Sequence, residues 1–555
     1  MPAVLTAFRH RLFIPAVVAL VAVLAAGAFM LRRAPDAGPA ERLGRQRPGF
    51  SSNDPIERAC ALKPEWLRRI ARGHVEGRSE DLTLVPRAPN YSGTFDVVSH
   101  SGPWDYLQKI PLVLYGPGRI ASGEHPSRPV GLKDVYPSVG SLLRARLPER
   151  AGRPLSEALE GGAPGAPKLV VTVVWDGVGT ETLELWPGRW PTLERLAARG
   201  TTYLNATAGS SPSITPATHS TLGTGVFPRV HRVPAIELRR KDGNVVTTFR
   251  GNDLSELERT TFADEFDRAR GNEPKVGLIG WNPWHIGMMG HGALTPGSDA
   301  DQLAIIDYKH PGRVTGNAAL YATPPYLDNF PSLEEHAHRL DLSDGRADHR
   351  WLGDEILARD DNPAWVDYQS DLVLAMLERE GYGADDVPDL FFANFYPSDA
   401  VGHFSSIDSK RTAAVLEAQD AALARLVEYL EQEVNDYVLV VTADHGHTRS
   451  ARSTGAWPIA QGELISDIDE RFNVPKDETL VEESAAFGLF LDRSVMNGLG
   501  VNATDIARYV NNYTIRDNWD PKELPSGYEG RADEEVFSAA WPSARLNDVI
   551  ECATQ

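Results

Sequence analysis

The sequence predicts an α/β protein built on a mainly parallel β-sheet that is sandwiched by helices. The first observation is a set of nearly continuous apolar runs, as expected of strands that are buried on both faces. Four such runs occur, at residues 168–176, 275–281, 389–396 and 437–443. The second observation is a pair of helical segments that lie between these runs, at residues 191–200 and 409–434. Strands that alternate with helices in this way usually form a parallel sheet.

Length and charge limit the possible functions. The chain has 555 residues, of which 42% are hydrophobic, which suffices for a catalytic domain with insertions. The formal net charge is −20. We therefore expect no nucleic-acid polymer as a partner, because such surfaces need clustered Lys and Arg. The acidic balance does not exclude a small anionic substrate, since bound metals can supply local positive charge.

The N-terminus carries an uncharged apolar run at residues 13–31 with Arg on both flanks. Its length is close to the roughly 20 residues that span a bilayer. We expect residues 1–33 to be a signal anchor, which gives a single-pass protein of the cell membrane with an extracytoplasmic catalytic domain. The alternative is a signal peptide cleaved at residues 26–28, which gives a secreted protein. Residues 34–58 are rich in Pro, Gly, Arg and Ser, a composition that predicts a flexible linker.

Three of the expected strands are followed by residues that bind metals. They are Asp176 after the first, Asp399 and His403 after the third, and Asp444 and His445 after the fourth. Ligands bind beyond the carboxyl ends of parallel strands, and carboxylates and imidazoles suit Zn²⁺ or a similar divalent ion. Each residue alone could be a helix N-cap or part of a turn. Their joint occurrence favours a metal site.

A candidate nucleophile lies in the hydroxyl-rich segment 210–225. We expect a helix to begin near Pro216, and the free N–H groups of a helix N-terminus suit a phosphate. Thr215 directly precedes this helix, where it could attack an anionic ester if a metal lowered its pKa. From the residues alone, Thr215 could equally be the helix N-cap.

With these segments in this order, the chain resembles the alkaline phosphatase superfamily, and within it the type I phosphodiesterase/nucleotide pyrophosphatase branch. Thr215, His219 and the pair 224–225 keep the spacing of that branch's Thr, His and Thr-Gly. Residues 399–403 match its D-x-x-G-H motif, and residues 444–446 match D-H-G. The resemblance implies an alkaline-phosphatase-like fold and the hydrolysis of a small-molecule phosphate ester, either a phosphodiester or a phosphomonoester.

The resemblance covers roughly residues 168–450 and implies two divalent metal ions, usually zinc, with Thr215 as the catalytic nucleophile. One ion would be held by Asp176, Thr215, Asp444 and His445. The other would be held by Asp399, His403 and one further His.

Two departures from the family pattern leave the reaction open. In the nucleotide pyrophosphatase branch, the segment after the nucleophile helix supplies an Asn to the substrate, but residues 231–240 contain none. Sulfatases of the superfamily use Cys or Ser followed by x-P-S-R, and residues 210–214 come close, with Ile214 in place of the Arg. The alternatives are therefore a sulfatase-like hydrolase, a transferase that passes a phospho-group to a cell-envelope acceptor, and a membrane-tethered binding protein with an inactive site.

The family's last metal-binding His lies downstream of D-H-G, but His447 is the last histidine of this chain. The passage that normally carries it resembles residues 97–120, near the opposite end, which contain His100. We interpret this as a circular permutation in which His100, and not His447, completes the second metal site. The alternative is an unrelated N-terminal domain with a loop histidine.

The permutation implies an order of segments and a pairing of the cysteines. Residues 59–147 would be the permuted C-terminal segment, residues 148–167 a linker, and residues 168–555 the catalytic core, with an inserted cap at about 286–365. In a permuted chain, the new ends lie where the parent chain was continuous, so Cys60 and Cys552 should be neighbours in space. A disulfide between them would persist in an exported protein. The alternative is two unpaired buried thiols.

Overall fold

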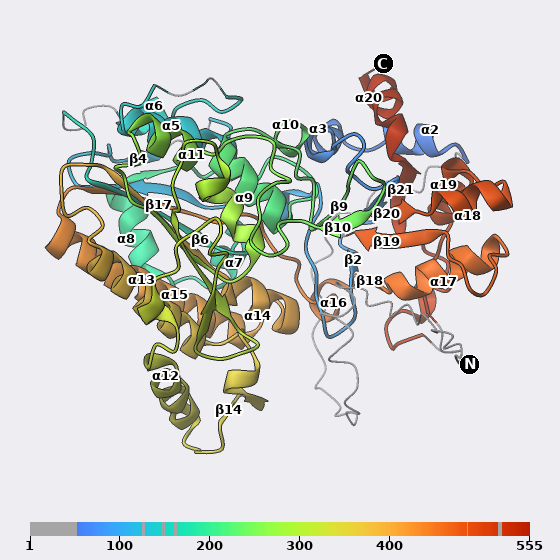
Figure 1. Cartoon of the computed structure of the whole chain (residues 1–555). Helices are drawn as coiled ribbons and strands as arrows, with labels where there is room; N and C mark the ends of the chain where they lie inside the picture. Colours follow the sequence, from blue (N-terminus) through green and yellow to red (C-terminus); the bar gives the residue numbers. More distant parts are fainter. Residues whose placement is uncertain are drawn as a thin grey trace, which may run out of the picture. The chain divides into compact units, whose positions relative to one another are not determined.

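A nine-stranded mixed sheet forms the centre of the computed structural model, which describes residues 53–554 except 125–127, 147, 149, 160–163, 486 and 520–523. In spatial order its strands are β13 (Arg313–Thr315), β12 (Gln302–Asp307), β11 (Val276–Gly280), β16 (Asp389–Phe395), β6 (Leu169–Trp175), β17 (Tyr437–Thr442), β3 (Leu112–Tyr115), β7 (Thr201–Thr202) and β4 (Gly123–Glu124) (Figure 1). The central strands β11, β16, β6 and β17 are parallel. The predicted α/β class with a mainly parallel sheet is confirmed.

Helices cover both faces of this sheet (Figure 1). One layer contains α8 (Pro191–Arg199), α13 (Pro363–Glu380) and α15 (Lys410–Tyr429), and the other contains α5 (Val135–Leu142), α9 (Thr215–Thr224) and α11 (Phe262–Ala269). Strands β6, β16 and β17 are buried along their whole length. Burial on both faces explains their continuous apolar sequences, because neither face meets water.

The segment expected to be an inserted cap, 286–365, is only partly a cap. Its apolar stretch β12 pairs with β11 in parallel, and β13 pairs with β12 in the antiparallel direction, so both extend the central sheet at one edge. The segment also forms α12 (Ser332–Asp341) and a short hairpin of β14 (Arg350–Trp351) and β15 (Asp354–Glu355). Helix α12 and the hairpin lie beyond the helical layer, at the bottom of Figure 1.

A second, four-stranded sheet joins the two ends of the described chain. Its order is β19 (Val481–Ala485), β20 (Gly488–Leu491), β1 (Leu82–Pro86) and β21 (Phe537–Pro542). Strand β1 is fully buried and pairs in the antiparallel direction with both β20 and β21. The same N-terminal region supplies β3, which pairs with β17 in the central sheet. Residues 82–115 are therefore integral to both sheets.

A disulfide links the same two regions. Cys60, at the end of α2 (Pro55–Cys60), is bonded to Cys552 in α20 (Leu546–Thr554), with 5.7 Å between the Cα atoms. The predicted disulfide is confirmed. Both helices pack against a small core that includes Trp541 and Val549.

The predicted membrane segment at 13–31 and most of the linker at 34–58 lie outside the described residues. None of the helices in the described part of the chain has the length and apolar character of a membrane span.

Removal of the disulfide should lower stability without changing the fold. We expect Cys60→Ser/Cys552→Ser to lower the free energy of unfolding by about 2–5 kcal/mol, because the bond constrains the unfolded chain. Thermal unfolding with and without a reductant measures this. The reductant should destabilise the wild type and leave the double variant unchanged; equal sensitivity of both proteins would contradict the prediction.

Candidate metal site and nucleophile

The three strands whose ends carry the candidate ligands are neighbours in the central sheet. β6 lies between β16 and β17, and in register Trp175 pairs with Phe395 and Val174 with Thr442. Because parallel strands end at the same edge, the residues that follow them meet there. Asp176 follows β6, Asp444 and His445 follow β17, and β16 leads into α14 (Pro397–Ser405), which carries Asp399 and His403.

The side chains form two groups with suitable ligand atoms within 4.8 Å of one another. The first, here called the Asp176 cluster, contains Asp176, Asp444 and His445. The second, the Asp399 cluster, contains His100, Asp399, His403 and His447. The His100 ring stacks on the His445 ring with 3.8 Å between centroids and 17° between planes. The two clusters are therefore adjacent.

In the Asp176 cluster, both carboxylates face one imidazole nitrogen. His445 Nε2 lies 3.1 Å from Asp444 Oδ2 and 3.6 Å from Asp176 Oδ1. The hydroxyl of Thr215, the first residue of α9, lies 3.4 Å from the same nitrogen. Thr218, one turn along, donates from Oγ1 to Asp444 Oδ2 at 3.3 Å. The nucleophile candidate is thus held against the Asp176 cluster.

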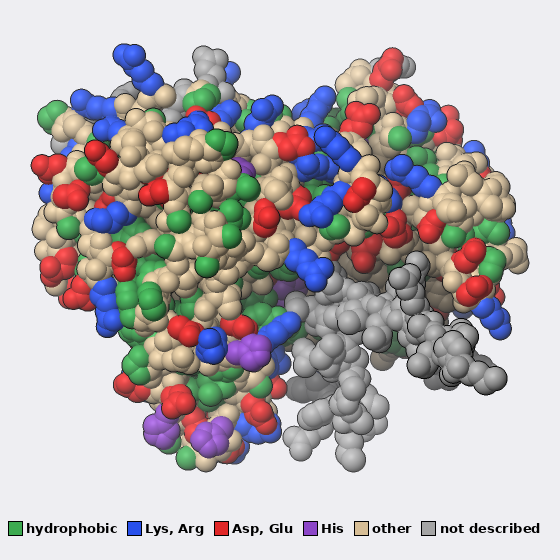
Figure 2. Space-filling view, in the orientation of Figure 1, with side chains coloured by type: hydrophobic (Ala, Val, Ile, Leu, Met, Phe, Trp, Pro, Cys, Tyr) green, Lys and Arg blue, Asp and Glu red, His purple; other side chains and the backbone are tan. Residues whose placement is uncertain are grey.

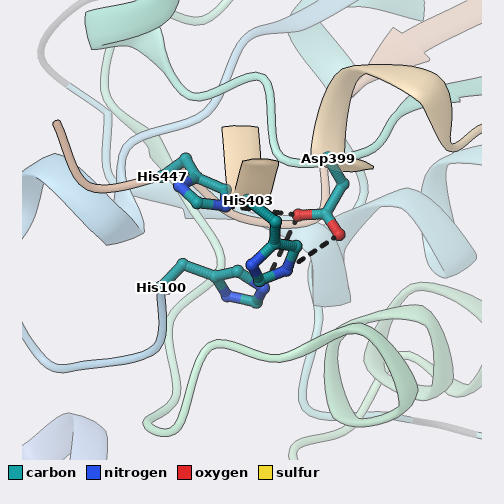
Figure 3. A group of neighbouring side chains, drawn as sticks. All are labelled: His100, Asp399, His403 and His447. Carbon is teal, nitrogen blue, oxygen red and sulfur yellow. Dashed lines mark ion pairs between the residues drawn. The ribbon is translucent and has the colours of Figure 1, made fainter. Parts of the chain in front are cut away.

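In the Asp399 cluster, three imidazoles surround one carboxylate (Figure 3). His403 Nε2 lies 3.3 Å from Asp399 Oδ2, and His100 Nε2 lies 3.5 Å from Oδ1. His447 Nε2 lies 3.8 Å from Oδ1. From the sequence, His100 was predicted at this site and His447 was not; in the structure both rings lie in the cluster.

The main chain orients all four imidazoles in the same way. In each ring, Nδ1 lies against a main-chain carbonyl oxygen. The pairs are His100 with Ser213 at 3.3 Å, His403 with Val98 at 2.7 Å, His445 with Gly446 at 3.1 Å and His447 with Thr448 at 3.4 Å. A neutral ring that donates from Nδ1 keeps the lone pair of Nε2 free for a metal. These contacts favour the tautomer in which each Nε2 carries the free lone pair.

The carboxylates carry strongly perturbed pKa values. Burial raises the pKa of Asp176 well above its usual range, and the nearby charge of Asp399 raises it further. Burial and the charge of Asp176 likewise raise the pKa of Asp444. Burial alone would raise the pKa of Asp399, but the neighbouring His403 and His100 hold it well below its usual range. Such perturbation by burial and close charges is typical of functional sites.

The residues fit a pair of divalent cations. Three buried ligand atoms, Asp176 Oδ1, Asp399 Oδ1 and His447 Nε2, have no hydrogen-bond partner within the described chain. No Lys or Arg of the described residues forms an ion pair with the three carboxylates, whose ion-pair partners there are all histidines. Buried carboxylates are normally paired or bound to a metal, and mixed carboxylate and imidazole ligands suit zinc and similar ions.

A second set of polar residues links the Asp176 cluster to α9. Asn394 Nδ2 donates to Asp176 Oδ2 and to His219 Nε2, both at 2.9 Å. His219 in turn donates from Nδ1 to the carbonyl of Thr215 at 2.9 Å. His285 Nε2 lies 3.3 Å from Asp176 Oδ2. Neither Asn394 nor His285 was predicted from the sequence, although Asn394 is the only amide in the apolar run 389–396.

A glycine permits the close approach of Asp176 and Asp399. Gly177 has φ +70°, and a Cβ atom there would lie 2.9 Å from Asp399 Oδ1. Both the left-handed backbone and the contact disfavour any larger residue.

Comparison with known proteins identifies the family. The sequence profile of the type I phosphodiesterase/nucleotide pyrophosphatase family matches residues 170–522, more than half of the chain. A 77-residue stretch is 30% identical to the alkaline phosphatase PhoD of Zymomonas mobilis subsp. mobilis, covering 14% of this chain and 13% of that protein. The chain thus spans only a small part of that curated relative.

Solved structures with a similar fold include the alkaline phosphatase PafA. A four-substitution mutant of PafA has a TM-score of 0.50 and 15% identity, covering 68% of this chain and 85% of that one. Phosphonoacetate hydrolase from Sinorhizobium meliloti 1021, in complex with phosphonoformate, has a TM-score of 0.30 and 18% identity, covering 52% and 58% of the two chains. The PafA mutant supports the fold alone.

The chain therefore belongs to the type I phosphodiesterase/nucleotide pyrophosphatase family of the alkaline phosphatase superfamily.

The site should bind two divalent ions per chain, and the ions should stabilise the fold. A cation that binds only the folded state stabilises it by about 4 kcal/mol at 1,000 times its Kd, and here it also relieves the repulsion between Asp176 and Asp399. Chelation should therefore lower the Tm, and zinc should restore it. Elemental analysis and thermal unfolding measure both effects. A protein that contains no bound metal and keeps its Tm under chelation would refute the two-metal site.

Proposed function

We propose that the protein hydrolyses a small phosphate ester in two steps, with Thr215 as the nucleophile and two zinc ions as cofactors. The observation that carries this proposal is the position of Thr215. Its hydroxyl lies at the first turn of α9 and 3.4 Å from His445 Nε2, beside the Asp176 cluster. A helix N-terminus attracts an anionic group, so a phosphoryl group bound there lies in front of the hydroxyl.

The roles of the residues follow from this geometry. The Thr215 hydroxyl loses its proton to solvent, and Oγ1 forms a bond to phosphorus as the bond to the leaving-group oxygen breaks on the opposite side; that oxygen takes up a proton from solvent. Water then loses a proton and forms the next bond to phosphorus, and the bond to Thr215 Oγ1 breaks, which returns the protonated hydroxyl. His219 keeps the first turn of α9 in place through the carbonyl of Thr215, and Thr218 ties the same turn to Asp444.

The cations would be held by the two clusters. Asp176, Asp444, His445 and the Thr215 hydroxyl would bind one, and Asp399, His403 and His100 the other. When bound, two such ions lower the pKa of an attacking hydroxyl and offset the charge on the attacking and leaving oxygens.

We also infer that residues 59–147 are the permuted C-terminal segment of the family fold. The family profile begins to match only at residue 170, yet the earlier segment supplies β3 to the central sheet and His100 to the Asp399 cluster. The loop that carries His100 is fixed to α14, because Val98 N donates to His403 O at 2.8 Å and His403 Nδ1 donates to Val98 O. The disulfide between Cys60 and Cys552 fits ends that were once continuous.

The cellular location follows from the N-terminal sequence. We propose that residues 1–33 anchor the protein in the cell membrane and that the catalytic domain faces an oxidising, extracytoplasmic compartment. The disulfide supports this location, because such bonds persist where thiols are not kept reduced.

Surface charge agrees with a small substrate: on the face in Figure 2, basic and acidic side chains are interspersed and form no continuous basic patch.

Replacement of the nucleophile should abolish turnover. We expect Thr215→Ala to lower kcat by about 10³-fold or more, with p-nitrophenyl phosphate and with bis-p-nitrophenyl phosphate, because no other group forms the covalent bond. Zinc content and Tm serve as controls, since the hydroxyl is only one of several ligands. A variant that keeps more than a tenth of the wild-type kcat would remove Thr215 from this role. Comparison of the two wild-type rates identifies the preferred ester.

Reversal of the permutation should preserve fold and activity. The variant joins residues 168–555 to residues 59–147 through a short flexible linker, which suffices because Cys60 and Cys552 Cα atoms lie 5.7 Å apart. Its matched control is the chain 59–555. We expect equal circular dichroism spectra and kcat within a few-fold. A rejoined chain that does not fold, while the control folds, would contradict the permutation.

A further inference from the structure

His447 has no function in the site as assigned so far. Its side chain is fully buried, and Nε2 has no hydrogen-bond partner within the described chain. An unsatisfied buried polar atom costs about 1–3 kcal/mol, and such atoms are rare in native structures. The unsatisfied nitrogen lies 3.8 Å from Asp399 Oδ1, the other unsatisfied atom of the same cluster. Both atoms need a partner, and a cation between them would serve both.

The backbone makes a specific place for this ring. Helix α14, which carries Asp399 and His403, has Gly402 opposite His447. A Cβ atom on residue 402 would lie 2.7 Å from His447 Cδ2 and 3.0 Å from Nε2, closer than such atoms approach. The orientation of the ring is also constrained at its other nitrogen, since Nδ1 faces the carbonyl oxygen of Thr448. Its position therefore results from two independent features of the fold.

We propose that His447 is a direct ligand of the cation in the Asp399 cluster. This inference rests on the proposed two-metal function, because it requires a cation in the Asp399 cluster. That cation then has four protein ligands, three imidazole nitrogens and one carboxylate oxygen. The Asp176 cluster differs, because it offers two carboxylates, one imidazole and the Thr215 hydroxyl.

Both sites then offer four protein ligands, so they differ in the type of ligand and not in the number. Imidazole nitrogen favours zinc, copper and nickel, whereas oxygen-rich sites accept manganese and magnesium. The cation of the Asp399 cluster is therefore the tightly held one, and the cation beside Thr215 is the exchangeable one.

Metal retention tests this assignment without reference to activity. The zinc-loaded protein is dialysed against chelators of increasing strength, and zinc per chain is measured at each step. The wild type should lose one zinc early and keep the second. His447→Ala should lose both early, with the affinity of the second site reduced by more than about 100-fold, since even outer-shell partners of a ligand contribute about 10–100-fold. The matched control is His349→Ala, whose side chain is 93% exposed and which should behave as the wild type.

Two further measurements guard against a trivial loss of fold. Gly402→Ala keeps every ligand but crowds the His447 ring, and it should weaken the second zinc in the same direction. Cobalt(II) in place of zinc should give the intense visible absorption of a four-coordinate ion in the wild type and a changed spectrum in His447→Gln.

The outcomes separate the two levels of the proposal. Wild-type retention and an unchanged cobalt spectrum in the His447 variants would overturn the ligand role of His447 alone. A wild-type protein that binds no metal would overturn the two-metal function itself.

Discussion

The buried carboxylates Asp176, Asp399 and Asp444 are the constraint on which the rest of the structure depends. Each is at most 4% exposed, and histidines alone pair with them in the described chain. Removing charges from water costs several kcal/mol per ion unless hydrogen bonds or opposite charges compensate. The fold supplies part of that compensation locally through oriented imidazoles and the Asn394 amide, and it leaves Asp176 Oδ1 and Asp399 Oδ1 without a hydrogen-bond partner in the described chain. The two clusters are therefore consistent with a bimetallic site.

Sequence periodicity predicted the parts of the fold that are buried on both sides. The strands β6, β16 and β17 match the expected runs to within about a residue, because they are buried along their whole length and most of their side chains are apolar. The positions of Asp176 and Asp444 followed, since parallel strands end at one edge. Strand β12 was missed because its short apolar stretch lies among Gly, Pro and Asp residues. The position of a residue in a strand can thus be predicted from the sequence when the strand is long and its apolar run is uninterrupted.

Loop residues were less predictable, because their directions depend on contacts that are remote in sequence. The position of His447 depends on Gly402, which lies in a different helix, as well as on the carbonyl of the next residue, Thr448, and no local pattern encodes the contact with Gly402. The expectation for His100 came only from the family resemblance, since a metal-binding loop histidine and an ordinary one look alike in sequence. What brings His100 to the cluster is the pairing of β3 with β17 and the reciprocal hydrogen bonds between Val98 and His403.

Charge balance between the two clusters bears on the substrate. With a divalent cation in each, the two carboxylates of the Asp176 cluster leave that site neutral, whereas the single carboxylate of the Asp399 cluster leaves a net charge of about +1. His447 adds a ligand without adding charge, so it preserves this difference. The N-terminus of α9 contributes roughly half a positive charge more. Because the whole chain carries a net charge of −20, an anion at Thr215 would depend on such a local positive field.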